Sequence, residues 1–187
     1  MLKKTFLFSI IISFCLIQSC KLILIKGNLK GLTSNYDKTK KECRNLINDS
    51  FNQTKSHPRN GSVNVVNGIH LSEIIKRSNK ALVYIWSPTC KSKFCSSLQF
   101  IKTQCEANFI TLYIVLEFYD CSFYNQILAN NLCVYGVDTK YYQTEFTQKY
   151  INKFLVDITG VDNIQMGDER LYFFENGQYK RKSVTFK

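Results

Sequence analysis

Short runs of β-branched and aromatic residues alternate with helical patterns from about residue 62 to the end of the chain. The runs are typical of strands, and segments whose apolar residues recur every three or four positions are typical of helices. We expect strands at 63–66, 81–86, 109–118, 132–137, 170–174 and 178–186, and helices at 71–78, 94–105, 122–131 and 141–155. This order predicts a single α/β domain over residues 62–187, a three-layer sandwich with helices on both faces of a mixed central sheet.

The last two runs flank the dipeptide Asn176-Gly177, which is typical of a tight two-residue turn. We therefore expect the domain to close with a C-terminal β-hairpin. Residues 26–61, in contrast, are mostly polar, and their apolar residues Leu46, Ile47 and Phe51 are widely spaced. Residues 20–61 are interpreted as a polar tether that includes a short helix.

Residues 1–19 have the pattern of an export signal, with Lys3 and Lys4 followed by the apolar run 6–17. The stretch Ile17-Gln18-Ser19-Cys20 resembles a bacterial lipobox. The resemblance implies that the signal is removed, that Cys20 is lipidated, and that the protein faces the periplasm from the membrane of a bacterial cell envelope. An uncleaved membrane anchor is the alternative, because residues 22–25 extend the apolar character, but the charge of Lys21 is costly inside a span.

Positive charge dominates the composition. The formal net charge is +11, and it becomes +9, with 23 basic and 14 acidic residues, when the leader with Lys3 and Lys4 is removed. Such a surface favours anionic surroundings such as phospholipid head groups. The basic residues are scattered between Lys21 and Lys187, with no basic helix and no Cys/His finger spacing, so no nucleic-acid partner is expected.

The run from Leu82 to Cys90, which reads LVYIWSPTC, resembles the thioredoxin superfamily, in which a buried strand ends in an aromatic-Trp pair and a short loop delivers a cysteine. Segments 138–142 and 157–160 look like the extracytoplasmic thioredoxin-like lipoproteins of Bacteroidetes-type bacteria. The resemblance implies a thioredoxin-like fold and thiol-disulfide exchange with protein thiols or disulfides. It makes Cys90 the attacking thiol and places Trp86, Pro88 and Thr89 in the active-site loop.

Two positions depart from the family. Lys93 occupies the place of the second cysteine of Cys-x-x-Cys, so Cys95, two residues later, is the expected resolving thiol. Segment 167–169 holds no proline where the family has a cis-proline before the hairpin. The alternative function is a redox-inactive thioredoxin-like domain that binds or assembles other proteins.

The start of the helix after Cys90 decides what this thiol can do. A helix capped by Thr89 would stabilise the Cys90 thiolate through its dipole but would hold Cys95 too far away for a bridge. A cap at Ser92 would leave Cys90 in a loop and allow closure. The sequence leaves both arrangements open.

Apart from the lipidated Cys20, the mature chain holds four further cysteines, enough with Cys90 and Cys95 for three bridges in an oxidising compartment. Cys105 is expected to be a buried small apolar residue or a bridge partner, a Cys121–Cys133 bridge is slightly favoured over two thiols, and Cys43 has no assigned role. His57 and His70 both precede the candidate loop, and His70 is expected at the surface. A copper site would therefore lack its third ligand, and no metal or cofactor is expected.

Overall fold

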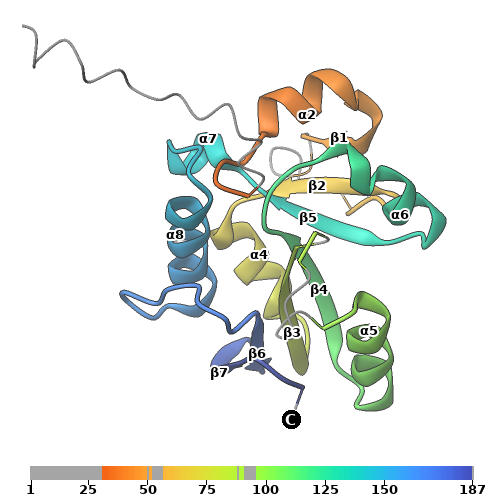
Figure 1. Ribbon diagram of the computed structural model, residues 1–187. Helices are drawn as coiled ribbons and strands as arrows, with labels where there is room; N and C mark the ends of the chain where they lie inside the picture. The colour runs from red at the N-terminus through yellow and green to blue at the C-terminus, as the bar shows by residue number, and fades with distance from the viewer. Residues whose placement is uncertain (1–30, 50, 52–56, 88, 91–95, 187) are drawn as a thin grey trace, which may run out of the picture.

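The protein is a three-layer α/β structure built on a seven-stranded mixed sheet (Figure 1). The computed structural model describes residues 31–49, 51, 57–87, 89–90 and 96–186. The strands are β1 (Ile47–Asn48), β2 (Ser62–Val66), β3 (Lys80–Trp86), β4 (Thr111–Leu116), β5 (Cys133–Val137), β6 (Leu171–Glu175) and β7 (Gln178–Ser183). The helices are α2 (Tyr36–Glu42), α4 (Gly68–Ile75), α5 (Leu98–Ala107), α6 (Tyr124–Ala129), α7 (Thr139–Tyr142) and α8 (Thr147–Thr159), with 3₁₀ turns η1 (Arg44–Leu46) and η2 (Cys121–Phe123).

The strand order is β1-β2-β5-β4-β3-β6-β7. The five strands from β1 to β3 in this order are parallel, whereas β6 is antiparallel to both β3 and β7. The mixed α/β sheet and its C-terminal hairpin are therefore confirmed. Asn176 and Gly177 form the hairpin turn with φ angles of 50° and 74°, which is the left-handed conformation that this dipeptide favours.

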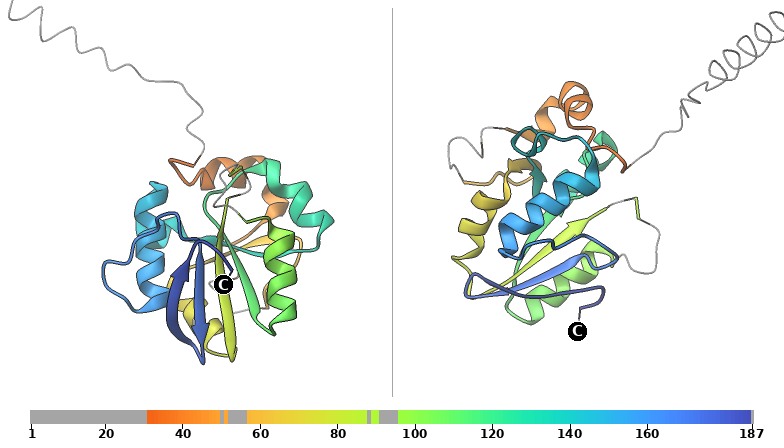
Figure 2. Two further views of the ribbon diagram at one scale, coloured as in Figure 1. Left: turned by 60° about the horizontal axis from the view of Figure 1, so that its bottom comes forward. Right: turned by 90° about the vertical axis from the view of Figure 1, so that its left-hand side faces the viewer.

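Helices cover both faces of the sheet, as the two views in Figure 2 show. Helices α4 and α8 pack on one face, and α5 and α6 pack on the other. Helix α8 has the amphipathic pattern of a helix packed on a sheet, because five apolar residues on one side of it are buried: Tyr150, Ile151, Phe154, Leu155 and Ile158. The parallel strands between the two helical layers are buried along most of their length, as strands covered on both faces are.

The helix expected at 141–155 is two helices. Helix α7 is capped by the Asp138 carboxylate, which accepts the N–H groups of Lys140 and Tyr141, and it stops at Gln143 in a left-handed conformation. The segment between α7 and α8 is extended, and Phe146 pairs in an antiparallel bridge with Thr33. A tertiary contact thus interrupts a pattern that is helical on both sides.

The segment interpreted as a tether is in part a component of the fold, which corrects the expected domain start at residue 62. Strand β1 pairs with β2, and the side chains of Tyr36, Leu46 and Phe51 are buried. The extended stretch 32–34 is held from two sides, because its backbone bonds both the Tyr119 N–H at 2.7 Å and segment 145–147. The short helix lies at 36–42, earlier than the sparse apolar residues indicated.

The predicted lipidation site Cys20 and the predicted signal at 1–19 lie outside the described residues. Within the described ranges, none of the helices is long and apolar enough to cross a membrane.

Candidate active site at the end of strand β3

Cys90 follows the buried strand β3, which lies near the centre of the sheet between β4 and β6. The strand ends at Trp86, whose side chain is buried and packs near Phe123 with 6.1 Å between ring centroids. The chain then turns, and the Cys90 N–H donates to the Ser87 carbonyl at 3.0 Å. Thr89 is exposed and Cys90 is half-buried, so this loop brings the cysteine to the protein surface. Pro88 and Cys95 lie outside the described residues.

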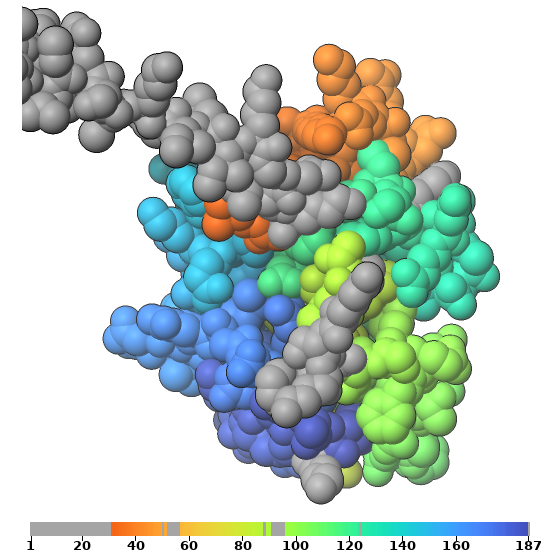
Figure 3. Space-filling model, viewed as in Figure 1, coloured from red at the N-terminus to blue at the C-terminus, as the bar shows by residue number. Residues whose placement is uncertain are grey.

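The far end of this loop is also fixed. The Tyr84 hydroxyl donates to the Ser96 carbonyl at 2.6 Å, and the Ser97 side chain accepts the Phe100 N–H and caps α5. Figure 3 shows the flanking segments in yellow-green, near the middle of the face it views. The loop that carries Cys90 therefore starts at the end of β3, and its other end is held by the Tyr84 hydroxyl of β3 and by the N-cap of α5.

Helix α5 begins at Leu98, later than either cap considered from the sequence. Ser97 is the N-cap of α5, so neither Thr89 nor Ser92 caps this helix, and Cys90 lies outside its first turn. The dipole of α5 acts within its first turn, so it cannot supply the thiolate stabilisation expected from a cap at Thr89. The Ser97 side chain accepts the Phe100 N–H, and the helical spacing of Leu98, Ile101 and Cys105 begins immediately after this cap.

Cys90 takes part in a disulfide. Of the other described cysteines, Cys43 and Cys121 bond each other, and Cys105 and Cys133 are free thiols.

A partly buried ion pair brackets the end of β3. Both amino nitrogens of Arg170 contact the Glu117 carboxylate, at 2.9 and 3.3 Å, and the side chains are only 16% and 12% exposed. The Glu117 N–H donates to the Trp86 carbonyl and the Arg170 carbonyl accepts the Ile85 N–H, both at 3.0 Å. The pair therefore joins β4 and β6 across the strand that leads to Cys90.

Sequence reasoning missed this pair. Glu117 and Arg170 are 53 positions apart, and neither belongs to a local motif. Only the strand order, with β4 and β6 on either side of β3, brings them together.

A shallow cavity of about 390 Å³ lies beside Glu117. Its apolar wall includes the side chains of Leu32 and Phe146, each 52% exposed. This cavity is formed where segment 31–33 pairs with segment 146–147.

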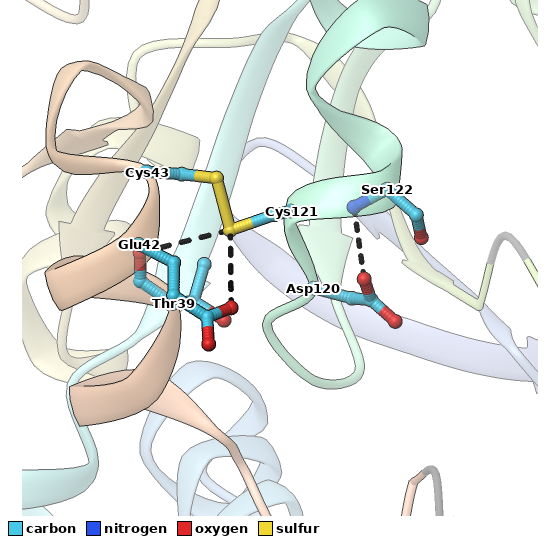
Figure 4. The surroundings of a disulfide bond; sticks show 6 residues. All are labelled: Thr39, Glu42, Cys43, Asp120, Cys121 and Ser122. Atoms are coloured by element: carbon cyan, nitrogen blue, oxygen red, sulfur yellow. Dashed lines mark hydrogen bonds between the residues drawn. A yellow bond between two sulfur atoms is a disulfide. The ribbon is translucent and has the colours of Figure 1, made fainter.

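The bridge that the structure describes in full is Cys43–Cys121, with 5.9 Å between the Cα atoms (Figure 4). The slight preference for a Cys121–Cys133 bridge is therefore wrong, and Cys43 gains a role. The bridge connects the end of α2 to η2, near the Thr39 carbonyl, which lies 3.8 Å from the Cys121 sulfur. It fixes the N-terminal segment to the main domain.

Cys105 is a buried free thiol on α5, as expected for a small apolar residue. Burial raises the pKa of its thiol to about 11, and the nearby Glu106 carboxylate adds to this effect. The thiolate is therefore rare near neutral pH, so the group is a poor nucleophile. Cys133 is half-buried and free, and burial raises the pKa of its thiol as well.

We expect the Cys105 thiol of the native protein to react with iodoacetamide at pH 8 at least about a hundredfold more slowly than after unfolding in guanidinium. Both its burial and its raised pKa oppose attack, and the second effect weakens as the pH approaches 11. Peptide mass spectrometry of timed samples measures the rate. Equal rates in the native and unfolded protein would contradict the packing of α5 on the sheet.

The described residues contain no group of three or more His, Cys, Asp or Glu side chains that could hold a metal ion. His70, expected at the surface, is half-buried and stacks on the Phe51 ring with 5.1 Å between centroids. Its ring belongs to the packing of α4 against the N-terminal segment.

Comparison of the chain with protein-family models, with curated proteins and with solved structures finds no match in any of the three.

Proposed function

We propose that this protein is a thiol-disulfide exchange protein with a thioredoxin-like domain, in which Cys90 and Cys95 form the redox bridge. The observation that carries the proposal is that Cys90, in the loop after a central buried strand, is disulfide-bonded. The buried thiol Cys105 and the half-buried thiol Cys133 are free. Cys95 is the nearest cysteine in sequence among those that the structure does not describe.

The strand arrangement supports the thioredoxin-like assignment. The unit β7-β6-β3-β4 has β3 and β4 parallel and β6 antiparallel to both of its neighbours. In this unit the strand that carries the cysteine loop is central and the closing hairpin lies beside it. Strands β5, β2 and β1 extend the sheet beyond β4, and fold alone does not establish activity.

The exchange chemistry requires only the two cysteines and a protein substrate with a disulfide. In the reduced protein, the Cys90 thiolate attacks one sulfur of the substrate disulfide, so that a mixed disulfide forms and one substrate thiolate leaves. The Cys95 thiolate then attacks the Cys90 sulfur and releases the second substrate thiolate. The substrate gains two electrons and two protons, and the Cys90–Cys95 pair loses them.

The surroundings of the loop supply a contact surface for such a substrate. The apolar cavity with Leu32 and Phe146 lies beside Glu117, and Glu117 bonds the end of β3. A polypeptide that places an apolar side chain in this cavity would be held close to the strand end from which the Cys90 loop leaves. The proposed substrates are therefore exported proteins with accessible disulfides, and not small thiols alone.

The location that we propose is the periplasmic side of a bacterial membrane, with lipid on Cys20. The support is the leader pattern of residues 1–19 and the Cys43–Cys121 bridge, because structural disulfides persist mainly in oxidising compartments. Palmitate labelling of cells that express the wild type or the Cys20→Ser variant tests the anchor. Equal labelling of the two would contradict it.

Replacing Cys90 by serine is expected to lower the rate of disulfide exchange at least about a hundredfold, because it removes the proposed attacking thiol and burial raises the pKa of the free thiols Cys105 and Cys133. The assay follows reduction of a peptide disulfide by the pre-reduced full chain. The matched control is Cys133→Ser, which removes a half-buried free thiol and should leave the rate within about twofold.

The Cys95→Ser variant separates attack from resolution. It should accumulate a mixed disulfide between Cys90 and the peptide, which mass spectrometry detects as an adduct of defined mass. An unchanged exchange rate in Cys90→Ser would refute the proposed function.

One observation favours the alternative, a redox-inactive domain that binds other proteins. Helix α5 begins too late to lower the pKa of the Cys90 thiol through its dipole. If mild reductant leaves the Cys90 bridge intact under conditions that open an exposed model disulfide, this alternative replaces the exchange function.

A further inference from the structure

The pairing of β6 with β7 contains an irregularity. Phe173 is opposite Arg181 and Phe174 is opposite Tyr179, so Lys180 is an extra residue in the edge strand. Side chains of a regular strand alternate between the two faces, and a bulge breaks this alternation. As a result, Lys180 and its neighbour Arg181 line the same cavity.

This cavity, of about 280 Å³, lies at the opposite end of β3 from the Cys90 loop. Its walls come from the start of β3, the end of α5, the hairpin and the C-terminal segment, which the left view of Figure 2 brings forward. The charged residues of its lining are the cations Lys80, Lys180 and Arg181 and one carboxylate, Glu175. The lining therefore has a net formal charge of +2.

Aromatic rings form the apolar part of the cavity. The Arg181 guanidinium lies 4.0 Å from the centroid of the Phe173 ring, and the Phe186 ring meets Phe173 edge-on with 5.7 Å between centroids. Both phenylalanines are only half-buried, so part of their surface remains open. A guanidinium stacked on a ring is oriented in advance and binds a carboxylate with less loss of side-chain entropy.

The rim carries a third aromatic residue. Phe109 lies between Asn108 and Ile110, which line the cavity, and its side chain is 91% exposed. Its φ of 55° is in the left-handed region, which asparagine and glycine enter more easily than phenylalanine does. The chain thus presents a large apolar side chain to water at a position where a smaller polar residue is the usual choice.

We propose that this cavity binds an organic anion with a flat apolar ring, such as an aromatic carboxylate. The ring would contact the open surfaces of Phe173 and Phe186, and the carboxylate would bond Lys180 and Arg181. Charge complementarity and the aromatic lining select this class over neutral ligands and over small inorganic anions. The site is independent of the proposed exchange chemistry, since it lies at the other end of the strand.

Binding of 2-naphthoate to the full chain tests the proposal, with saturation-transfer NMR as the readout. Lys180→Gln and Arg181→Gln should each weaken binding about tenfold, because each removes a charged hydrogen bond to the carboxylate. The matched control is Lys182→Gln. It changes the same charge in the same strand, but Lys182 contacts Glu169 and the Gln165 carbonyl rather than the cavity. The control should bind like the wild type.

Two further compounds test separately the contribution of the carboxylate and that of the aromatic ring. The uncharged 2-naphthalenemethanol should bind at least about tenfold more weakly than naphthoate, and acetate should not compete. Lys180 is exposed, so its substitution leaves the core intact, and thermal unfolding of each variant verifies this. Equal naphthoate binding by Lys180→Gln, Lys182→Gln and the wild type would overturn the proposal, whatever the activity of Cys90.

Discussion

Replacing Cys43 and Cys121 together by serine is expected to lower the free energy of unfolding by about 4 kcal/mol and the unfolding midpoint by about 10 °C. The bridge joins residues 78 positions apart, so its loss greatly increases the conformational freedom of the unfolded chain. Urea and thermal unfolding of the oxidised wild type and the double variant measure the difference.

The control for this experiment is Cys133→Ser, which changes a free thiol and closes no loop. We expect it to cost less than about 1 kcal/mol. Hydrogen exchange adds a local readout, because α2 and segment 32–34 should lose protection first in the double variant. Equal stability of the double variant and the wild type would contradict a structural role for the bridge.

Replacing Arg170 by methionine is expected to lower the free energy of unfolding by about 3 kcal/mol. The substitution leaves the Glu117 carboxylate, whose side chain is only 12% exposed, without its cationic partner. The double variant Arg170→Met/Glu117→Leu should recover most of this loss, because it removes both charges together. Denaturant unfolding of the four proteins gives a double-mutant cycle.

The ion pair Lys182–Glu169 provides a comparison in the same part of the molecule. Its side chains are 32% and 34% exposed, and its nitrogen-oxygen distance is 3.3 Å. Lys182→Met should therefore cost less than about 1 kcal/mol. If Arg170→Met costs no more than Lys182→Met, the Glu117–Arg170 pair does not stabilise the end of β3.

The regular parts of the fold could be predicted from the sequence because their patterns are local. The run 81–86 holds six successive apolar residues, and the structure buries all of them in β3. The turn at Asn176-Gly177 follows from the left-handed conformations that both residues adopt easily. Both patterns involve residues that are adjacent in sequence, so the structure that they predict does not depend on contacts with distant segments.

The remainder depends on contacts between distant residues. No local pattern connects Cys43 with Cys121, or Glu117 with Arg170, and the tether interpretation failed because Tyr36, Leu46 and Phe51 find their partners far along the chain. The start of α5 could have been predicted better, since Ser97 is a strong cap immediately before the apolar spacing begins.

The position of the N-terminal segment also constrains the order in which the molecule can form. The backbone of segment 32–34 bonds Tyr119 and segment 145–147, and its helix is attached through Cys121. During synthesis these partners emerge long after the segment itself, since domains are made from the N-terminus onward. The first described part of the chain is therefore among the last that can dock, and a ribosome-bound fragment ending before residue 119 would lack both the Tyr119 ring that packs on Tyr36 and the Cys121 thiol that bonds Cys43.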